Sequence, residues 1–588
     1  MILEENDPMI KRLAKSLREF KTQTYLTLLL IVGEAVIETL IPFKTAELVN
    51  SVKENAGMEE VLRLGLLLTV LAVISLSFGG LAGYTCSKAS AGFARNLRGD
   101  MFRHIQSFDF ENIDKFSSSS LVTRMTTDVS NIQMAFMMII RTAVRSPLML
   151  IFSTVMAFVM GGWVATAFVV VIPVLAFGLI MIGKKALPAF RSVFRKYDKL
   201  NESIEENVRG IRVVKGFARE EFEKKKFDSA ADNIRRDFTK AERIVALNNP
   251  LMNFCLYFIM VFVLIAGSKL AVSSGGAAFD VGQMSGMLVY GMQILMSLMM
   301  LSMIYVIVTM SGESAKRVCE VLEETPTLSE PEDALYELKD GSVVFENVSF
   351  KYSKTAEANA LNGINLKIES GMTVGIIGST GSGKTTLAQL IPRLFDVTEG
   401  RILVGGEDVK RYDLDTLRGG VAMVLQKNLL FSGTIAENLR WGNENASDEE
   451  LRDACRLACA EEFINEFPDG YDTKIEQGGT NVSGGQKQRL CIARALLKKP
   501  KILILDDSTS AVDMKTDALI REGFRKYIPE TTKIIIAQRI ASVQDADMII
   551  VMDNGTASAA GDHETLLSTS QIYREVWEQQ TRGGESDE

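Results

Sequence analysis

The sequence predicts an all-α membrane domain of six spanning helices followed by an α/β domain built around a P-loop. The chain of 588 residues is 47% hydrophobic and 23% charged, with a mean hydropathy of +0.13. This balance is expected when a membrane half and a soluble half are joined. Long uncharged apolar stretches fill the first half, and short β-branched runs alternate with helical stretches from about Gly341. We expect an amphipathic N-terminal helix, a transmembrane domain, a linker and a soluble α/β domain at residues 1–22, 23–315, 316–340 and 341–588.

The membrane half contains six apolar stretches. A spanning helix needs about 20 mostly apolar residues. One uncharged run, Ser146 to Gly183, is long enough for two spans, and Gly161-Gly162 supplies a turn between them. The other spans are predicted at Tyr25–Phe43, Leu64–Ser87, Ala246–Ser268 and Val281–Gly312.

The segments between the spans predict the orientation in the membrane. Lys88–Asp128 and Lys184–Arg243 are long and rich in Lys and Arg, so the positive-inside rule places them in the cytosol together with both termini and the α/β domain. Their helical periodicity predicts that the spanning helices continue into the cytosol. We expect short turns at the tips of these extensions, near Glu111–Lys115 and Gly210–Gly216.

The N-terminal segment has the pattern of one amphipathic helix. Its apolar residues are spaced three and four apart, and its other face is basic. Such a helix is suited to lying on the inner surface of the lipid bilayer. The apolar positions are Ile10, Leu13, Leu17 and Phe20, and the basic ones are Lys11, Arg12, Lys15 and Arg18.

Four charged residues lie in or beside the predicted spans, where a charge is costly and suggests a role. Glu34 and Glu38 are one helical turn apart in the first span, and Arg141 and Arg145 are one turn apart near the start of the third. Two interpretations stay open. Either the charges form an internal ion pair or lie near the membrane interface, or the acids line a cavity that accepts cationic cargo.

The last span is rich in methionine, whose flexible side chain adapts to varied apolar ligands but also serves ordinary packing. We therefore expect apolar, cationic or peptide-like cargo, such as drugs, lipids or peptides. The net charge of −8 argues against a nucleic-acid partner. The methionines are Met284, Met287, Met292, Met296, Met299, Met300, Met303 and Met310.

The most specific motif is a P-loop, which follows an apolar strand at Thr373–Ile377 and precedes a helical segment. Glycines let backbone N–H groups approach phosphate oxygens, and the helix N-terminus adds partial positive charge. Lys384 is expected to reach the β- and γ-phosphates of ATP, and Thr385 to ligate Mg²⁺. The candidate ATP-binding residues are Gly378, Ser379, Thr380, Gly381, Ser382, Gly383, Lys384, Thr385 and Thr386.

A second strand, Lys501–Asp506, has the continuous apolar run of a buried parallel strand and ends in an acid. An acid at the carboxyl end of such a strand, beside a P-loop, is where Mg²⁺ is held. Asp506 is therefore the second candidate Mg²⁺ ligand.

Between these two motifs lies a segment that resembles the signature motif of ABC ATPases, with Val482 in place of the usual leucine. The order of P-loop, signature and acidic strand is also that of the ABC family. The resemblance implies that two nucleotide domains meet head to tail, with each ATP held between one P-loop and the signature of the other chain. The signature residues are Val482, Ser483, Gly484, Gly485 and Gln486.

Further positions match the family one by one. Tyr352 resembles the aromatic residue that stacks on adenine, and Gln426 a glutamine that senses Mg²⁺ and contacts the membrane domain. Ser510-Ala511-Val512-Asp513 resembles the loop that crosses the dimer interface. The six spans with long extensions resemble the exporter branch, in which short coupling helices at the extension tips touch the nucleotide domains.

Two positions depart from the family pattern. The catalytic glutamate that follows the Mg²⁺ aspartate is here Asp507, which is one methylene shorter, and the γ-phosphate histidine is Gln538. A misplacement of about 1 Å can cost roughly 10²-fold in rate. Gln477 stands where many members have glutamate. The chain thus resembles the degenerate-site subunit of heterodimeric bacterial multidrug-type exporters, in which a second half-transporter in the cell membrane supplies the intact glutamate and histidine.

Other functions remain open on the sequence. One is a homodimeric exporter that hydrolyses ATP slowly with Asp507. Another is an ATP-gated channel or regulatory subunit, and a third is an importer with exporter architecture.

Overall fold

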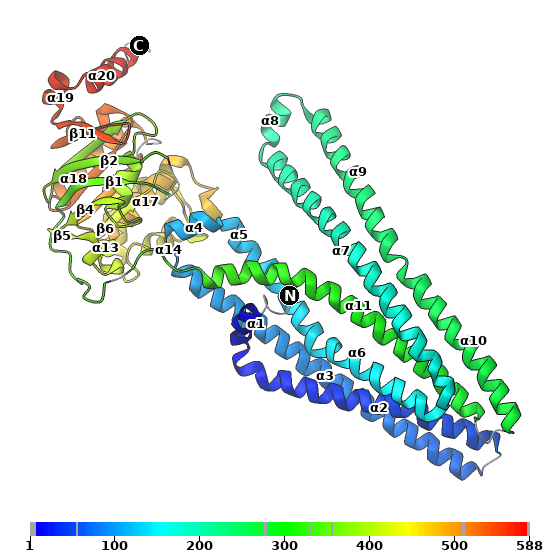
Figure 1. Cartoon of the computed structure of the whole chain (residues 1–588). Helices are drawn as coiled ribbons and strands as arrows, with labels where there is room; N and C mark the ends of the chain where they lie inside the picture. The colour runs from blue at the N-terminus through cyan, green and yellow to red at the C-terminus, as the bar shows by residue number, and fades with distance from the viewer. Residues whose placement is uncertain are drawn as a thin grey trace. The chain divides into compact units, whose positions relative to one another are not determined.

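The computed structural model describes residues 7–54, 57–275, 279–329, 331–353, 357–508 and 512–584. The chain divides into two compact units (Figure 1). The helical unit consists of Met1–Ser107 and Ser117–Glu324, and the α/β unit of Phe108–Phe116 and Thr325–Glu588. Residues 1–6 of the predicted N-terminal helix lie outside the described residues.

Each of the six predicted apolar stretches lies in its own long helix. Among the described residues, five continuous helical segments are long and apolar enough to cross a membrane, and one of them, Ser118–Arg209, carries two of the stretches. The two helices of that segment are separated by the short η3 (Gly162–Ala165), whose first residue, Gly162, has a φ of 48°. The six helices are α2 (Lys21–Lys53), α3 (Met58–Gln106), α6 (Val129–Gly161), α7 (Thr166–Arg209), α10 (Asn248–Ser274) and α11 (Val281–Glu323).

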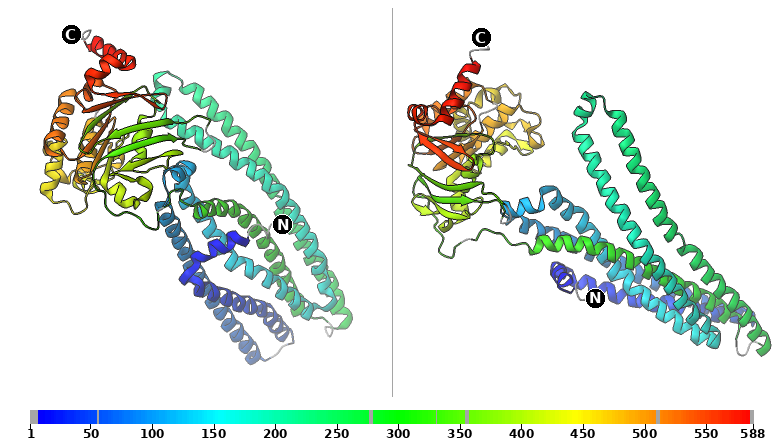
Figure 2. Two further views of the ribbon diagram at one scale, coloured as in Figure 1. Left: turned by 60° about the vertical axis from the view of Figure 1, so that its left-hand side comes forward. Right: turned by 45° about the horizontal axis from the view of Figure 1, so that its top comes forward.

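The spanning helices continue well beyond the apolar stretches, as the sequence predicts. The tips of the extensions are short helices, α4 (Phe110–Phe116) and α8 (Ile211–Gly216), where turns were expected. The extension of α7 runs beside α9 (Glu220–Val245) as far as α8 (Figures 1 and 2). An ion pair of 2.5 Å between Lys196 Nζ and Asp237 Oδ2 joins α7 to α9.

The prediction of one continuous N-terminal helix is wrong. The segment forms α1 (Asp7–Ala14) and the short η1 (Lys15–Phe20), with a break at Arg18, whose φ is 38° and ψ −115°. We attribute the break to polar contacts with Asp100 of α3. Its carboxylate accepts from the Ser16 hydroxyl at 2.7 Å and from the Arg18 guanidinium at 2.5 Å. Part of the predicted basic face therefore contacts protein.

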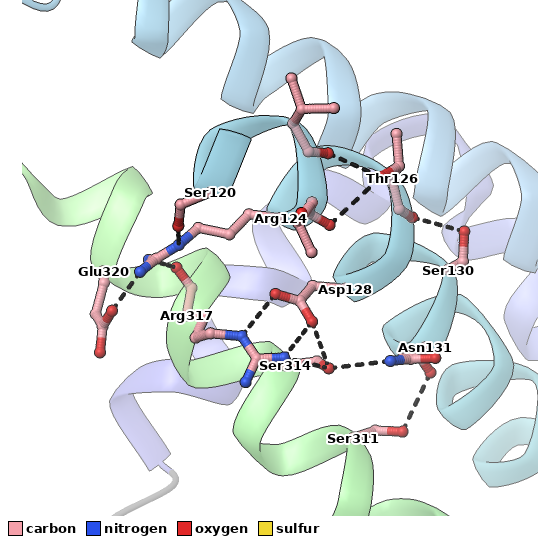
Figure 3. Close-up of polar contacts among 12 residues, drawn as sticks. Ser120, Arg124, Thr126, Asp128, Ser130, Asn131, Ser311, Ser314, Arg317 and Glu320 are labelled. Carbon is pink, nitrogen blue, oxygen red and sulfur yellow. Dashed lines mark hydrogen bonds and ion pairs between the residues drawn. The ribbon is translucent and has the colours of Figure 1, made fainter. Parts of the chain in front are cut away.

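The parts of α6 and α11 that extend beyond the apolar stretches are joined by a buried carboxylate (Figure 3). Asp128 is 1% exposed and ends a π-helical turn, Arg124–Asp128, that precedes α6. Arg317 of α11 donates to both of its oxygens, with the Nε–Oδ2 distance at 2.7 Å, and the Ser314 hydroxyl donates to Oδ1 at 2.8 Å. The Asp128 carboxylate raises the pKa of Arg317. A second cation, Arg124, forms a 3.0 Å ion pair with Glu320 of α11.

The α/β unit contains a six-stranded sheet in the order β12-β11-β3-β10-β9-β6, in which only β12 is antiparallel to its neighbour. A four-stranded antiparallel sheet, β2-β1-β4-β5, and a two-stranded antiparallel sheet of β7 and β8 complete it. The strands are β1 (Val343–Phe350), β2 (Leu361–Ile368), β3 (Thr373–Gly378), β4 (Glu399–Val404), β5 (Glu407–Asp408), β6 (Val421–Val424), β7 (Gly433–Thr434), β8 (Lys474–Ile475), β9 (Ile502–Asp506), β10 (Thr532–Ile536), β11 (Met548–Asp553) and β12 (Thr556–Gly561).

Helices cover both faces of the six-stranded sheet, and the alternation of side chains along each strand decides which core a residue enters. On β9, Ile502 and Ile504 enter one core with α12 (Lys384–Leu390) and the four-stranded sheet. Leu503 and Leu505 enter the other core with α17 (Gly484–Leu497). The helix after the P-loop and the helix after the signature therefore lie on opposite faces of the sheet.

The remaining helices of the α/β unit surround these two cores. Of these, α14, α15, α16, α18 and α19 contribute buried residues to the core that contains α17. The remaining helices of the α/β unit are α13 (Leu414–Gly420), α14 (Ile435–Arg440), α15 (Asp448–Leu457), α16 (Glu461–Glu466), α18 (Met514–Tyr527), α19 (His563–Thr569) and α20 (Gln571–Gly584). In the helical unit, one further short helix is α5 (Ser118–Thr123).

The α4 segment belongs to the α/β unit through its contacts. Asp109 Oδ2 accepts from the backbone N–H groups of Thr327 and Leu328 at 2.6 and 3.0 Å, and the ring of Phe110 lies 6.0 Å from that of Phe395. The predicted linker, 316–340, begins inside α11, because that helix continues to Glu323.

We expect Arg317→Met to destabilise the helical unit by about 2 kcal/mol, because it leaves the Asp128 carboxylate buried without its cation. A thiol-reactive dye that reports exposure of the buried Cys86, Cys255 and Cys319 on heating would measure the shift in midpoint. Arg235→Met is the matched control, since Arg235 pairs with Asp232 at the surface and should shift the midpoint little. Equal shifts for the two variants would contradict the role of the buried pair.

Candidate functional site

The candidate site lies at the carboxyl edge of the six-stranded sheet. Four adjacent parallel strands, β3, β10, β9 and β6, end there, and each is followed by predicted site residues. Lys384 follows β3, Gln538 follows β10, Asp506 ends β9 with Asp507 next to it, and Gln426 follows β6. Since parallel strands end at one edge, residues more than 100 positions apart in the chain converge there.

The P-loop has the geometry that its glycines predict. Gly378 and Gly383 have φ values of 152° and 97°, and a Cβ at Gly378 would lie 2.2 Å from the Met552 carbonyl oxygen. At Gly383 a Cβ would lie 2.8 Å from a methyl carbon of Leu361. Only glycine fits both positions. Ser379, Thr380 and Gly381 are exposed, whereas Ser382 is 2% exposed.

Lys384 lies over the loop that it is expected to serve. Its ammonium group donates to the carbonyl oxygens of Gly378 and Ser379 at 2.9 and 2.7 Å. Burial lowers the pKa of Lys384, and the nearby carboxylates of Asp506 and Asp507 oppose that shift. The cation is thus held at the mouth of the loop, where phosphate oxygens would meet both it and the N-terminus of α12.

Thr385 and Asp506 meet as the predicted pair of Mg²⁺ ligands. The Thr385 hydroxyl donates to Asp506 Oδ1 at 3.1 Å. Asp506 is 3% exposed, and burial together with Asp507 raises its pKa, against the hydrogen bond from Thr385 and the charge of Lys384. A hydroxyl and a carboxylate are the oxygen donors that Mg²⁺ prefers, and a bound cation would favour the ionised form of the buried acid.

The two positions that depart from the family pattern contact each other. Asp507 Oδ2 accepts from the amide groups of Gln538 at 2.9 Å and of Gln426 at 3.3 Å. The Asp507 backbone is left-handed, with φ at 49°, a conformation that aspartate tolerates better than most residues. Sequence analysis selected all three residues but did not predict that they bond to one another.

Tyr352 lies beside α12, as expected of a residue that contacts the base of the nucleotide. Its hydroxyl pairs with the Thr386 hydroxyl at 2.9 Å, so Thr386, which is 7% exposed, is engaged by this contact. Phe350 and Phe395 meet the Tyr352 ring edge to face, at centroid distances of 4.9 and 5.3 Å. Sequence analysis missed these two supporting aromatics, because nothing in their spacing marks them.

The signature residues form the exposed N-terminus of α17. Ser483 is the N-cap, and its hydroxyl accepts from the Gln486 N–H at 3.3 Å while the Gln486 side chain accepts from the Ser483 N–H at 2.9 Å. Val482 is buried in the core, as a leucine would be. Ser483 and Gly484 are exposed. The end of the helix, with its free N–H groups, is therefore open to an anion.

The predicted interface loop is described only in part, because Ser510 and Ala511 lie outside the described residues. Asp513 caps α18, accepting from the backbone N–H and hydroxyl of Thr516 at 2.9 and 2.7 Å. Gln477 is exposed at the start of a 3₁₀ turn, Gln477–Gly479, that lies before the signature.

Lys384→Ala should raise the dissociation constant of ATP by about tenfold or more, because a charge-assisted contact with phosphate is lost. Titration of the full chain in nanodiscs with a fluorescent ATP analogue measures this. Lys367→Ala is the matched control, since Lys367 is an exposed residue of β2 that pairs with Glu369. An unchanged dissociation constant for Lys384→Ala would rule out the phosphate role.

Acidification should remove the Mg²⁺-dependent part of the ATP affinity. The pKa of Asp506 is raised above its ordinary 3.8, so its carboxyl group takes up a proton at higher pH than a free aspartate and then binds Mg²⁺ poorly. The difference in ATP affinity with and without Mg²⁺, followed from neutral to acidic pH, measures the effect. Asp506→Asn should show little Mg²⁺ dependence at any pH, and a wild-type profile in this variant would contradict the assignment.

Comparison with known proteins agrees with this geometry. Residues 24–298 match the family described as ABC transporter transmembrane region, and residues 361–510 match the family described as ABC transporter. The chain is similar to the uncharacterized ABC transporter ATP-binding protein YfiB of Bacillus subtilis, with 35% identity over 564 residues that cover 96% of this chain and 97% of that protein.

A second relative is the uncharacterized ABC transporter ATP-binding protein Rv1273c of Mycobacterium tuberculosis, with 33% identity over 577 residues that cover 96% of this chain and 97% of that protein. A solved structure of a bacterial Atm1-family ABC exporter with ATP bound has the same fold, with a TM-score of 0.81, 24% identity, and coverage of 96% of this chain and 98% of that one. This chain is therefore a member of the ABC transporter family, a helical membrane domain of exporter fold fused to an ABC ATPase domain.

Proposed function

We propose that this chain is the degenerate-site half of a heterodimeric ABC exporter. It binds ATP and Mg²⁺ at its own P-loop, hydrolyses that ATP slowly, and offers an intact signature to the ATP held by a partner half-transporter. The partner carries the catalytic glutamate and histidine. The cargo is an apolar or amphipathic compound moved across a bacterial cell membrane, with both termini and the ATPase domain in the cytosol.

The contact between Asp507 and Gln538 carries this proposal. A general base needs a free oxygen at the attacking water, but Asp507 is one methylene short and its Oδ2 accepts from two amide groups. Gln538 cannot become cationic as a histidine does. Neither histidine of the chain replaces it. His104 lies in the helical unit on α3, and His563 Nδ1 pairs with the Tyr573 hydroxyl at the start of α19.

The placement of the signature supports the need for a second chain. The helices α12 and α17 lie on opposite faces of the sheet and pack into different hydrophobic cores. The N-terminus of α17 is therefore on the other side of the sheet from the P-loop helix of its own chain. An exposed helix N-terminus with Ser483 and Gly484 suits a γ-phosphate supplied by another chain. The family arrangement, head to tail, provides that phosphate.

The purified full chain alone should hydrolyse ATP about 10²-fold more slowly than the complex formed with a half-transporter that carries both catalytic residues. The partner to co-express is a half-transporter with intact glutamate and histidine, sought first in the neighbouring coding sequences. Phosphate release from both preparations in nanodiscs measures the difference. Hydrolysis by the lone chain at the rate of the complex, abolished by Asp507→Asn, would overturn the proposal that this chain needs a partner's catalytic residues.

Restoring both residues should restore hydrolysis. Asp507→Glu combined with Gln538→His should raise the ATPase rate of the lone chain by at least about tenfold, since P-loop, Mg²⁺ ligands and signature are retained. Asp553→Glu combined with Gln571→His makes the same two exchanges outside the site and should leave the rate unchanged. If the two double variants hydrolyse ATP equally slowly at equal thermal stability, positions 507 and 538 do not limit hydrolysis.

A further inference from the structure

A cavity of about 800 Å³ lies among α2, α6 and α11 of the helical unit, and a cavity of this size suits a small ligand. Each helix contributes a stripe of residues three or four apart, so each stripe is one helical face. The walls are formed by Glu38, Ile41 and Pro42 of α2, by Met137, Met138, Arg141, Thr142, Arg145, Ser146 and Met149 of α6, and by Val289, Met292, Gln293, Met296, Ser297 and Met300 of α11.

The acids that sequence analysis considered for cationic cargo are already paired. Arg145 lies 2.5 Å from Glu38 Oε2 and 3.6 Å from Glu34 Oε1. Glu34 is 7% exposed, and its carboxylate lies against Gly79 of α3, away from the cavity walls. The structure thus favours the internal ion pair of the two interpretations. A cationic ligand would have to compete with a guanidinium already in place.

The charge that remains toward the cavity is positive. Arg141 lies one turn before Arg145, is exposed, and forms neither an ion pair nor a hydrogen bond with any residue that the structure describes. Gln293 accepts from the Ser153 hydroxyl at 2.8 Å through its carbonyl oxygen, which leaves its NH₂ group as a donor. The polar groups not already paired are therefore donors, which suit an anion.

The rest of the lining is flexible and apolar. Six methionines from α6 and α11 account for most of the apolar wall. Their unbranched thioether side chains adapt to apolar bodies of different shape. The cavity thus combines one cationic end with an adaptable apolar wall.

From this arrangement we propose that the cavity binds an amphipathic organic anion, with the acidic group at Arg141 and the apolar body along the methionines. The proposal names the cargo class of the transport function proposed above and rests on that function. An arginine that lines the cavity without a hydrogen-bonded carboxylate gains a charge-assisted hydrogen bond from such a ligand. Arg141 would select the anion, while the Arg145–Glu38 pair stays a neutral part of the wall.

The test uses the full chain in nanodiscs and three fluorescent probes with one body: 11-(dansylamino)undecanoic acid, its methyl ester, and the analogue with a trimethylammonium head. Each is titrated with empty nanodiscs as background. The acid should bind about tenfold or more tightly than the ester, and the ammonium probe should bind no better than the ester. Arg141→Gln should abolish the preference for the acid and leave the ester unchanged.

Three variants test whether the preference for the acid probe arises from the charge of Arg141 in the cavity. Arg141→Lys keeps the charge and should retain part of the preference, which guards against a general folding defect in Arg141→Gln. Arg95→Gln removes an exposed arginine of α3 outside the cavity and should change nothing. Met296→Trp narrows the cavity and should weaken the acid and the ester alike.

Equal binding of the acid and ammonium probes, tighter binding of the ammonium probe, or an acid preference that survives Arg141→Gln would each overturn the proposal, as would no binding above the background. These outcomes are distinguishable from failure of the proposed function, because the titration needs neither ATP nor a partner and the ATPase comparison does not involve Arg141.

Discussion

The parallel sheet of the α/β unit imposes one constraint on which the nucleotide chemistry depends. Strands β3, β10, β9 and β6 are adjacent and point the same way, so the chain that leaves each of them emerges at one edge. That edge holds Lys384 over the P-loop, Thr385 against Asp506, and Asp507 between two glutamines. The residues expected to bind ATP and Mg²⁺ and the residues expected to act in hydrolysis thereby lie on separate loops at one edge of the sheet. A change confined to Asp507 and Gln538 can weaken hydrolysis while the phosphate and Mg²⁺ contacts persist.

The same sheet also separates this chain's two nucleotide elements. Alternation along β9 sends Ile502 and Ile504 toward α12 but Leu503 and Leu505 toward α17. The P-loop helix and the signature helix consequently lie on opposite faces. In the function proposed above, an ATP at the P-loop meets the signature of another chain, and the exposed N-terminus of α17 faces the ATP of that chain. This division makes an asymmetric pair of half-transporters physically reasonable.

In the helical unit, the cost of burying charge organises the contacts between helices. Asp128 is almost fully buried and is satisfied by Arg317 and Ser314, which joins the extensions of α6 and α11 (Figure 3). Arg145 pairs with Glu38 at 2.5 Å and lies 3.6 Å from Glu34, between α6 and α2. Arg141 lines the cavity without a hydrogen bond or ion pair to any residue that the structure describes, although its charge acts on Glu34, and it is the contact that we propose for an acidic ligand.

The sequence by itself determined the fold class, the six apolar stretches, the P-loop and the acidic strand, because these depend on local composition and on motifs of fixed spacing. The predicted strands at Thr373–Ile377 and Lys501–Asp506 lie within one residue of β3 and β9. Tertiary structure alone decided the break at Arg18, the bond between Asp507 and Gln538, and the partner of Glu38. Each of these depends on groups far apart in the chain, whose approach is set by strand order and helix packing and leaves no periodic trace in the sequence.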